Sequence, residues 1–214
     1  MTDQAESKSG GMERWQKIAR RIRVPLGFVT AALYLFELWR KPPQTTAIAL
    51  SVLLVLPGLW LRAYASGYVK KNRELTQTGP YAYTRNPLYL GSILIAAGFA
   101  VALLSWPVAS MMAAMFLIIY VPVIASEERF LRSTFPDFAA YCQRVPRLIP
   151  RLSREQAGSA AGSGSGLTEV SSGKFSLDLY LRHREYNAAI GAALLYLSLL
   201  FLRPALGLVV HVPR

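Results

Sequence analysis

Hydrophobic residues in this chain are gathered into long uncharged runs that short basic segments separate. The longest run lies between Arg85 and Glu127, where 41 consecutive residues include no Asp, Glu, Lys or Arg. A helix of about 20 apolar residues crosses the hydrocarbon core of a bilayer, so this run is long enough for two spans. The pattern excludes a soluble enzyme, a coiled coil and a disordered chain.

The long run divides near its middle at Ser105-Trp106-Pro107. The break leaves two segments, residues 86–104 and 107–126. At a rise of 1.5 Å per residue, each is long enough to cross the hydrocarbon core of the bilayer once. The sequence therefore predicts a helical hairpin with a tight turn at Trp106. The two charged residues that bound the run then lie at the two feet of this hairpin, on the same side of the membrane.

Three further apolar runs complete the predicted membrane domain, at residues 24–39, 46–65 and 187–202. The predicted fold class is all-α, with five transmembrane helices. Pro57 inside the second of these runs predicts a kink. Arg62 lies near the end of the same run, where its side chain can extend to the membrane interface.

The polar segment 127–152 carries large apolar residues at near-helical spacing. This spacing predicts one amphipathic helix at the membrane interface. The apolar positions are Phe130, Leu131, Phe135, Phe138 and Tyr141.

Composition divides the chain into four parts. A basic segment, 1–23, precedes a four-span membrane domain, 24–152. A Gly/Ser-rich linker follows at 153–175, and it is richest in small residues over 157–173. Residues 176–214 then hold an amphipathic segment and the fifth transmembrane helix.

The charge distribution predicts the orientation of these helices. If the N-terminus is cytoplasmic, 20 basic residues lie on the inner segments and four on the outer ones, as the positive-inside rule requires. Both feet of the hairpin then face the cytoplasm, as in a protein of a bacterial inner membrane. Contact with anionic lipids explains the net charge of +12 without nucleic acid as a partner. A single cysteine, Cys142, and two distant histidines provide neither a disulfide nor a metal site.

Three motifs gather at the cytoplasmic end of the predicted hairpin. Residues 78–91 read Thr-Gly-Pro-Tyr-Ala-Tyr-Thr-Arg-Asn-Pro-Leu-Tyr-Leu-Gly, Glu127-Glu128 ends the second helix, and residues 141–150 read Tyr-Cys-Gln-Arg-Val-Pro-Arg-Leu-Ile-Pro. Pro87 in the first motif suits the first turn of a helix. Taken singly, the motifs also fit an interfacial aromatic belt, a solvated group of ion pairs, and contacts with lipid phosphates.

Together, the order and spacing of the motifs resemble the isoprenylcysteine carboxyl methyltransferase and phospholipid methyltransferase superfamily. The resemblance covers about residues 75–150. It implies S-adenosylmethionine-dependent methyl transfer to a lipophilic acceptor at the cytoplasmic membrane face, with S-adenosylhomocysteine as the product. The other spans share only hydrophobicity with the family, and the oligomeric state stays open.

The resemblance also assigns roles to individual residues by their place in the motifs. Arg85 and Glu127 correspond to the reacting centre. The cofactor pocket is implied over the hairpin, closed by the segment that follows the two glutamates, and no metal is implied. Its residues correspond to Tyr81, Asn86, Tyr89, Glu128, Tyr141, Arg147 and Leu148.

Two positions depart from the family pattern. Asn86 stands where the family usually has histidine, and an amide still donates and accepts hydrogen bonds but cannot act as an acid or base. The prenylcysteine enzymes carry a further arginine just before the glutamate pair, whereas residues 120–126 here are uncharged. The second departure argues against a prenylcysteine carboxylate as the acceptor.

The sequence leaves the chemistry of the acceptor open, and it also allows two other functions. Arg85 can hold a carboxylate or a phosphate of the acceptor in a bidentate contact, whereas Glu127 can take a proton from an amine acceptor. A membrane reductase of the steroid-reductase type, with a similar hairpin and NADPH as cofactor, is one alternative. A non-enzymatic membrane scaffold or transport subunit is the other.

Overall fold

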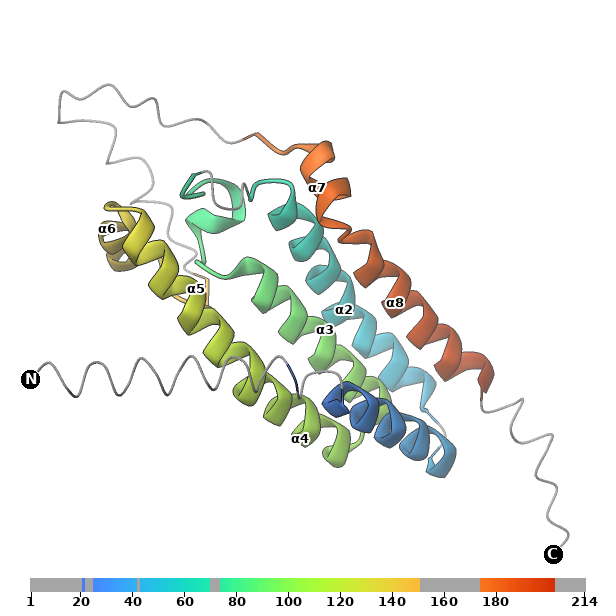
Figure 1. Cartoon of the computed structure of the whole chain (residues 1–214). Coiled ribbons are helices and arrows are strands. Elements are labelled where there is room, and N and C mark those ends of the chain that lie inside the picture. Colours follow the sequence, from blue (N-terminus) through green and yellow to red (C-terminus); the bar gives the residue numbers. More distant parts are fainter. Residues whose placement is uncertain (1–20, 22–24, 42, 70–73, 151–173, 203–214) are drawn as a thin grey trace, which may run out of the picture. The chain divides into compact units, whose positions relative to one another are not determined.

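The computed structural model describes residue 21 and residues 25–41, 43–69, 74–150 and 174–202, and within these residues all regular secondary structure is helical (Figure 1). The all-α class is therefore confirmed for the described part of the chain. Residues 153–173 of the predicted linker, most of the basic N-terminal segment and the C-terminal tail from residue 203 lie outside it.

The chain forms two compact units. The first comprises the described parts of Met1–Val55, Ile95–Arg129 and Gly191–Arg214, and the second comprises those of Leu56–Leu94 and Phe130–Ile190. The long helices α2 (Thr45–Ser66) and α3 (Pro87–Leu103) contribute residues to both units.

The predicted break in the long apolar run is confirmed. α3 ends at Leu103, Leu104 adopts a positive φ of 47°, and α4 (Trp106–Met115) begins two residues later. Ser105 is extended, and its hydroxyl accepts a hydrogen bond from the Val108 N–H as the cap of α4. A serine cap followed by Trp-Pro thus starts a new helix directly after the turn.

The helix that begins at Trp106 is longer than the sequence indicates. A π-helical segment, η2 (Phe116–Tyr120), joins α4 to α5 (Val121–Thr134), so that the helix continues eight residues past the predicted end at Ser126. Two helices of the described residues, Thr45–Ser66 and Trp106–Thr134, are long and apolar enough to cross a membrane. Pro87–Leu103 and Tyr186–Phe201 are shorter apolar helices, so the five spans and the orientation stay predictions.

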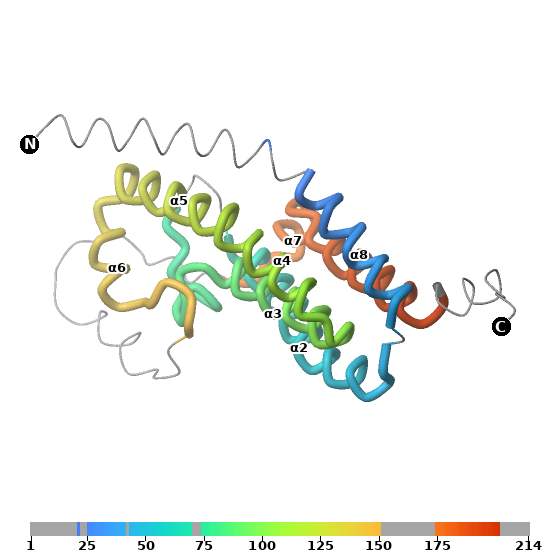
Figure 2. The backbone as a smooth tube through the Cα atoms, turned by 90° about the horizontal axis from the view of Figure 1, so that it is seen from below, coloured from blue at the N-terminus to red at the C-terminus, as the bar shows by residue number. Residues whose placement is uncertain are grey.

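The prediction of one amphipathic helix over 127–152 is wrong. The segment begins as the last turns of α5, breaks at Pro136, and continues as the short helix α6 (Phe138–Arg144) (Figures 1 and 2). Proline lacks the N–H that a continuous helix needs at this position, which explains the break.

The apolar spacing in this segment nevertheless marks a real core. The buried residues of this core are Phe138, Tyr141 and Val145, and the half-buried residues packed against them are Leu75, Leu131, Phe135 and Cys142. Phe130 is not part of this core, and half of its side chain is exposed.

The C-terminal helices follow a sharp turn. α7 (Leu177–His183) ends at Arg184, which adopts the left-handed conformation, and α8 (Tyr186–Leu197) continues into the π-helical segment η5 (Ser198–Leu202). In the first unit, α8 and η5 contact other helices through hydroxyl groups. The Tyr196 hydroxyl lies 2.8 Å from Ser51 Oγ, and Ser198 Oγ lies 2.6 Å from the Tyr34 hydroxyl.

α2 and α3 approach each other closely at glycines. A Cβ atom added at Gly98 would lie 2.5 Å from Val55 Cγ2 and 3.0 Å from the Ser51 carbonyl oxygen. In a membrane, where apolar burial does not distinguish lipid from protein, such small residues allow the close contact that holds helices together.

Gly98→Ala is therefore expected to destabilise the protein by about 1–3 kcal/mol, because the added methyl group overlaps a stiff side chain and a helix backbone. For a chain of this size, thermal unfolding in detergent should show a fall of about 2–4 °C for each kcal/mol. Gly191→Ala is the matched control, since no described atom lies within 4 Å of its added Cβ. Equal melting temperatures for the two variants would contradict the close packing.

Candidate functional site

The first motif forms a short turn that is set by glycine and proline. η1 (Gly79–Ala82) begins at Gly79, whose φ of +61° lies in the region that favours glycine. A Cβ atom there would lie 2.8 Å from the ring of Tyr68. The turn delivers the chain to Pro87, where α3 starts.

The residues just before α3 are bound to the third motif by a group of hydrogen bonds, here called the clasp. It joins residues 84–86 to residues 146–148. The Arg85 N–H donates to the Pro146 carbonyl oxygen at 2.9 Å, the Thr84 hydroxyl donates to the Leu148 carbonyl oxygen at 3.0 Å, and the Asn86 side-chain amide donates to the Arg147 carbonyl oxygen at 2.8 Å. Two motifs about 60 residues apart in sequence therefore form one local structure.

Tyr141 supports the clasp from the buried side. Its side chain is almost fully buried, and its hydroxyl donates to the Tyr81 carbonyl oxygen at 2.7 Å. Burial raises the pKa of the Tyr141 hydroxyl above its ordinary value, so the group remains a neutral donor across the physiological range. Its ring also lies 6.2 Å from that of Phe138, measured between centroids.

Arg85 extends from the clasp towards α6. Its Nη1 atom lies 2.8 Å from Cys142 Sγ as a hydrogen-bond donor, and its backbone is fixed by the bond to Pro146. Arg85, Asn86 and Tyr89 are all partly exposed, so their side chains are accessible in part. A guanidinium, an amide and a phenol are thus presented at the start of one helix.

The structure brings together most of the residues that the sequence selects. Within the second compact unit, hydrogen bonds connect the segments that hold Tyr81, Arg85, Asn86, Tyr141, Arg147 and Leu148. Tyr89 lies in the first turn of α3, in the same unit. Glu127 and Glu128 lie in α5 and belong to the other unit, so their place beside these residues stays a prediction.

Thr84 is a member of the site that sequence reasoning missed. It is almost completely buried, and its hydroxyl binds the third motif directly. The signal was its position before Arg-Asn-Pro, because a threonine hydroxyl just ahead of a helix commonly binds nearby backbone groups.

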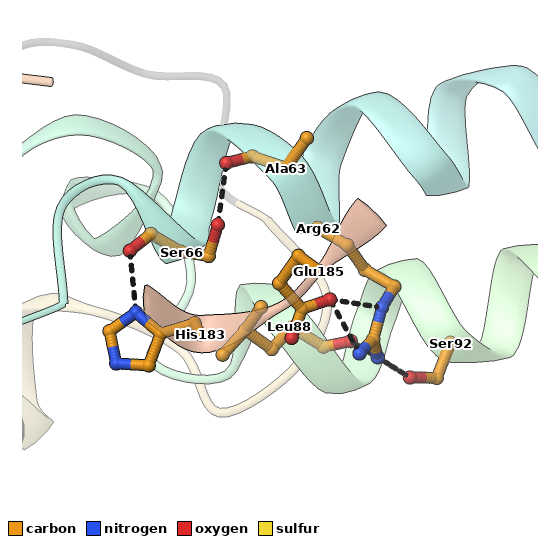
Figure 3. Close-up of polar contacts among 7 residues, drawn as sticks. All are labelled: Arg62, Ala63, Ser66, Leu88, Ser92, His183 and Glu185. Carbon is orange, nitrogen blue, oxygen red and sulfur yellow. Dashed lines mark hydrogen bonds and ion pairs between the residues drawn. The ribbon is translucent and has the colours of Figure 1, made fainter. Parts of the chain in front are cut away.

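Arg62 and Glu185 were also missed as partners (Figure 3). The Arg62 guanidinium donates to the Glu185 carboxylate from Nε at 3.0 Å and from Nη2 at 2.7 Å. Its Nη1 atom donates to the Leu88 carbonyl oxygen at 3.2 Å and to the Ser92 hydroxyl. The Arg62 side chain is 23% exposed, and its guanidinium is bound by groups of the protein. A charged residue inside an apolar helix should have suggested a specific partner.

Among the residues that the structure describes, no group of three or more His, Cys, Asp and Glu side chains is placed to hold a metal ion. The polar groups that the clasp and its neighbours present are a guanidinium, an amide, phenols and backbone groups. These groups suit an organic ligand with anionic and aromatic parts.

Comparison with known proteins finds a family match over part of the chain. Residues 45–137 match the phospholipid methyltransferase family, which belongs to the superfamily of integral membrane methyltransferases. The match includes the first motif and the glutamate pair, and it ends before Tyr141 and the third motif.

Two relatives carry names from metal resistance. The chain is 39% identical over 137 residues to the cobalt-zinc-cadmium resistance protein CzcN of Cupriavidus metallidurans, which covers 61% of this chain and 62% of that protein. It is 36% identical over 118 residues to the nickel-cobalt-cadmium resistance protein NccN of Alcaligenes xylosoxydans xylosoxydans, which covers 55% and 54%. The chain thus matches less than two thirds of either relative, and no solved structure matches it.

Tyr141→Phe should lower stability by about 1–3 kcal/mol at pH 7, because the buried Tyr81 carbonyl loses this donor. The difference between wild type and variant should shrink as the pH rises above about 10, where the tyrosine of the unfolded chain ionises. The folded protein holds the Tyr141 proton more tightly, so the wild type should lose about 1 kcal/mol relative to the variant by pH 11.

Urea unfolding of both proteins at pH 7 and pH 11 measures this difference. Tyr83→Phe serves as the control, because the Tyr83 side chain is 40% exposed. A gap between wild type and Tyr141→Phe that is constant with pH would contradict the buried, neutral hydroxyl.

Proposed function

We propose that the chain is a membrane methyltransferase that uses S-adenosylmethionine and modifies a lipophilic acceptor at the cytoplasmic face of a bacterial membrane. The observation that carries this proposal is the clasp. It fixes Arg85 and Asn86 at the start of α3, within the region that matches the phospholipid methyltransferase family. The family match supports the reaction, and the clasp supports a preorganised place for it.

The groups at the clasp fit the cofactor. A methionine carboxylate suits the positive end of the α3 dipole. Amide and backbone groups around Asn86 and Arg147 suit the ribose and adenine, and the Tyr81 and Tyr89 rings suit a cationic sulfonium or a flat base. When bound, the cofactor supplies a methyl group that an acceptor lone pair attacks in line with the departing sulfur.

The protein's own residues then orient the acceptor and move its proton. We propose that Arg85 holds an anionic group of the acceptor and that Glu127 removes a proton if the acceptor atom is an amine nitrogen. Leu148, Tyr141 and Glu128 complete the proposed pocket by their motif positions. Orientation of this kind supplies most of the rate in a reaction that needs little covalent help.

The names of the relatives suggest the biological setting. Both are named for resistance to divalent metals. We propose that this chain contributes to such resistance through a methylated lipid. The effect would then lie in the membrane, where methylation of a headgroup changes the polar groups that metal ions meet.

S-adenosylhomocysteine should bind the detergent-solubilised protein and raise its melting temperature by mass action, whereas NADPH should not. Titration of each ligand against thermal unfolding measures this, with adenosine as a control for the shared base. A shift with NADPH and none with S-adenosylhomocysteine would favour the reductase. Two flat titrations would favour the scaffold.

Glu127→Gln should abolish turnover while it leaves the affinity for S-adenosylhomocysteine within a few-fold, because the amide keeps the shape of the side chain and removes the base. Asn86→Ala and Tyr89→Ala should weaken cofactor binding first. Isothermal titration and initial rates on the same preparations separate the two effects. Loss of affinity in step with activity in Glu127→Gln would make Glu127 a cofactor ligand, and full activity would make it a surface group.

A further inference from the structure

The Arg62 guanidinium lies against the helix start that the proposed function uses. It binds the Leu88 carbonyl oxygen and the Ser92 hydroxyl, which lie on either side of Tyr89 along α3. The Ser92 hydroxyl also donates to the Leu88 carbonyl oxygen at 3.0 Å. One side chain of α2 therefore restrains the first two turns of α3 at adjacent points.

The first motif contains a glycine that makes this contact possible. A Cβ atom at Gly91 would lie 2.6 Å from Arg62 Cγ and 2.7 Å from the Gly58 carbonyl oxygen. Any larger residue would displace the Arg62 stem or the α2 backbone. Gly91 thus provides the room through which Arg62 reaches α3.

Glu185 fixes the direction of the guanidinium. It contacts two nitrogens of Arg62, and the Glu185 and Arg62 side chains are only 14% and 23% exposed. A partly buried pair is weakly screened by salt, and its geometry is more restricted than that of a surface pair. The turn that carries Glu185 is held further by His183, whose Nδ1 lies 3.2 Å from the Ser66 carbonyl oxygen (Figure 3).

Residues 86–92 are therefore restrained by two separate sets of bonds within one compact unit. The clasp binds Asn86 through its side chain, and the Leu90 N–H donates to the Asn86 carbonyl oxygen at 3.0 Å. Arg62 binds one turn further along α3. Glu185 comes from a segment outside residues 45–137, so the C-terminal helices supply part of the support for the matched region.

We infer that Arg62, oriented by Glu185, is a positioning residue for the proposed cofactor site, because it sets the start of α3 from which Asn86 and Tyr89 project. The inference rests on the proposed function. It assigns to the C-terminal segment 174–202 a role in cofactor affinity, and it touches neither the acceptor nor the transferred methyl group.

Glu185→Gln tests the inference, because the amide keeps the shape of Glu185 and removes its charge. Two measurements are made on full-length protein in nanodiscs. One is hydrogen exchange of peptides that cover residues 86–92 without ligand, and the other is the affinity for S-adenosylhomocysteine together with KM and kcat. Asp178→Asn is the matched control, since Asp178 pairs with Arg182 at 3.7 Å on α7 with both side chains mostly exposed.

The expected result is faster exchange over residues 86–92 and about ten-fold weaker binding of S-adenosylhomocysteine in Glu185→Gln, with kcat at saturation within two-fold of wild type. Asp178→Asn should match wild type in both measurements. Ser92→Ala, which removes one Arg62 contact and leaves the ion pair, should show the same changes at smaller size. If Glu185→Gln does not fold, the same measurements on Ser92→Ala test the positioning role.

A fall in melting temperature with unchanged affinity and unchanged exchange would overturn the inference and leave Arg62 as a structural anchor only. The inference is also overturned if Asp178→Asn weakens binding as much as Glu185→Gln. If wild-type protein itself fails to bind S-adenosylhomocysteine, the proposed function is overturned and the positioning role falls with it. Normal wild-type binding with unchanged affinity in the variants overturns the positioning role alone.

Discussion

Pro87 begins α3 and disfavours a helical conformation for the residue before it, so residues 84–86 lie outside the helix and donate hydrogen bonds to another segment. The acceptors are the backbone carbonyls of 146–148, a stretch bounded by Pro146 and Pro150. These hydrogen bonds, the clasp, join the start of α3 to the segment that follows α6. The buried Tyr141 hydroxyl bonds to Tyr81 in the same motif, and Arg85 and Asn86 are members of the clasp. The rest of the candidate site depends on the clasp.

The apolar helices are also held by a few specific contacts. Their packing uses small residues where backbones meet, such as Gly91 and Gly98, and isolated polar contacts where a side chain must be fixed. Arg62 is one such contact, and its guanidinium is bound by a carboxylate, a carbonyl oxygen and a hydroxyl together. Such contacts orient helices that apolar burial alone would leave free to rotate or slide.

Local signals in the sequence predicted much of this structure. The uncharged run and its Ser-Trp-Pro break predicted the turn between α3 and α4, and the paired motifs predicted that residues near 85 and near 147 belong to one site. The sequence analysis did not predict that the helix continues to Thr134 and breaks at Pro136. The spacing of apolar residues suggested one helix through this segment, although a proline lies within it.

The sequence also could not predict contacts between residues that are far apart along the chain. Nothing near Arg62 in the sequence indicates Glu185, which lies 123 residues away. Thr84 was overlooked because a single buried hydroxyl leaves no periodic pattern. The sharing of one site by Arg85 and Glu127 follows from the hairpin argument and stays a prediction, as do the five spans.

The central claim is that this chain transfers a methyl group to a molecule of the membrane. The most direct measurement reconstitutes the purified protein in vesicles of bacterial lipid with S-adenosylmethionine that carries a labelled methyl group. We expect the label to move into the organic extract while one S-adenosylhomocysteine appears for each methyl group transferred. Intact S-adenosylmethionine, or label that stays entirely in the aqueous phase, would contradict this claim.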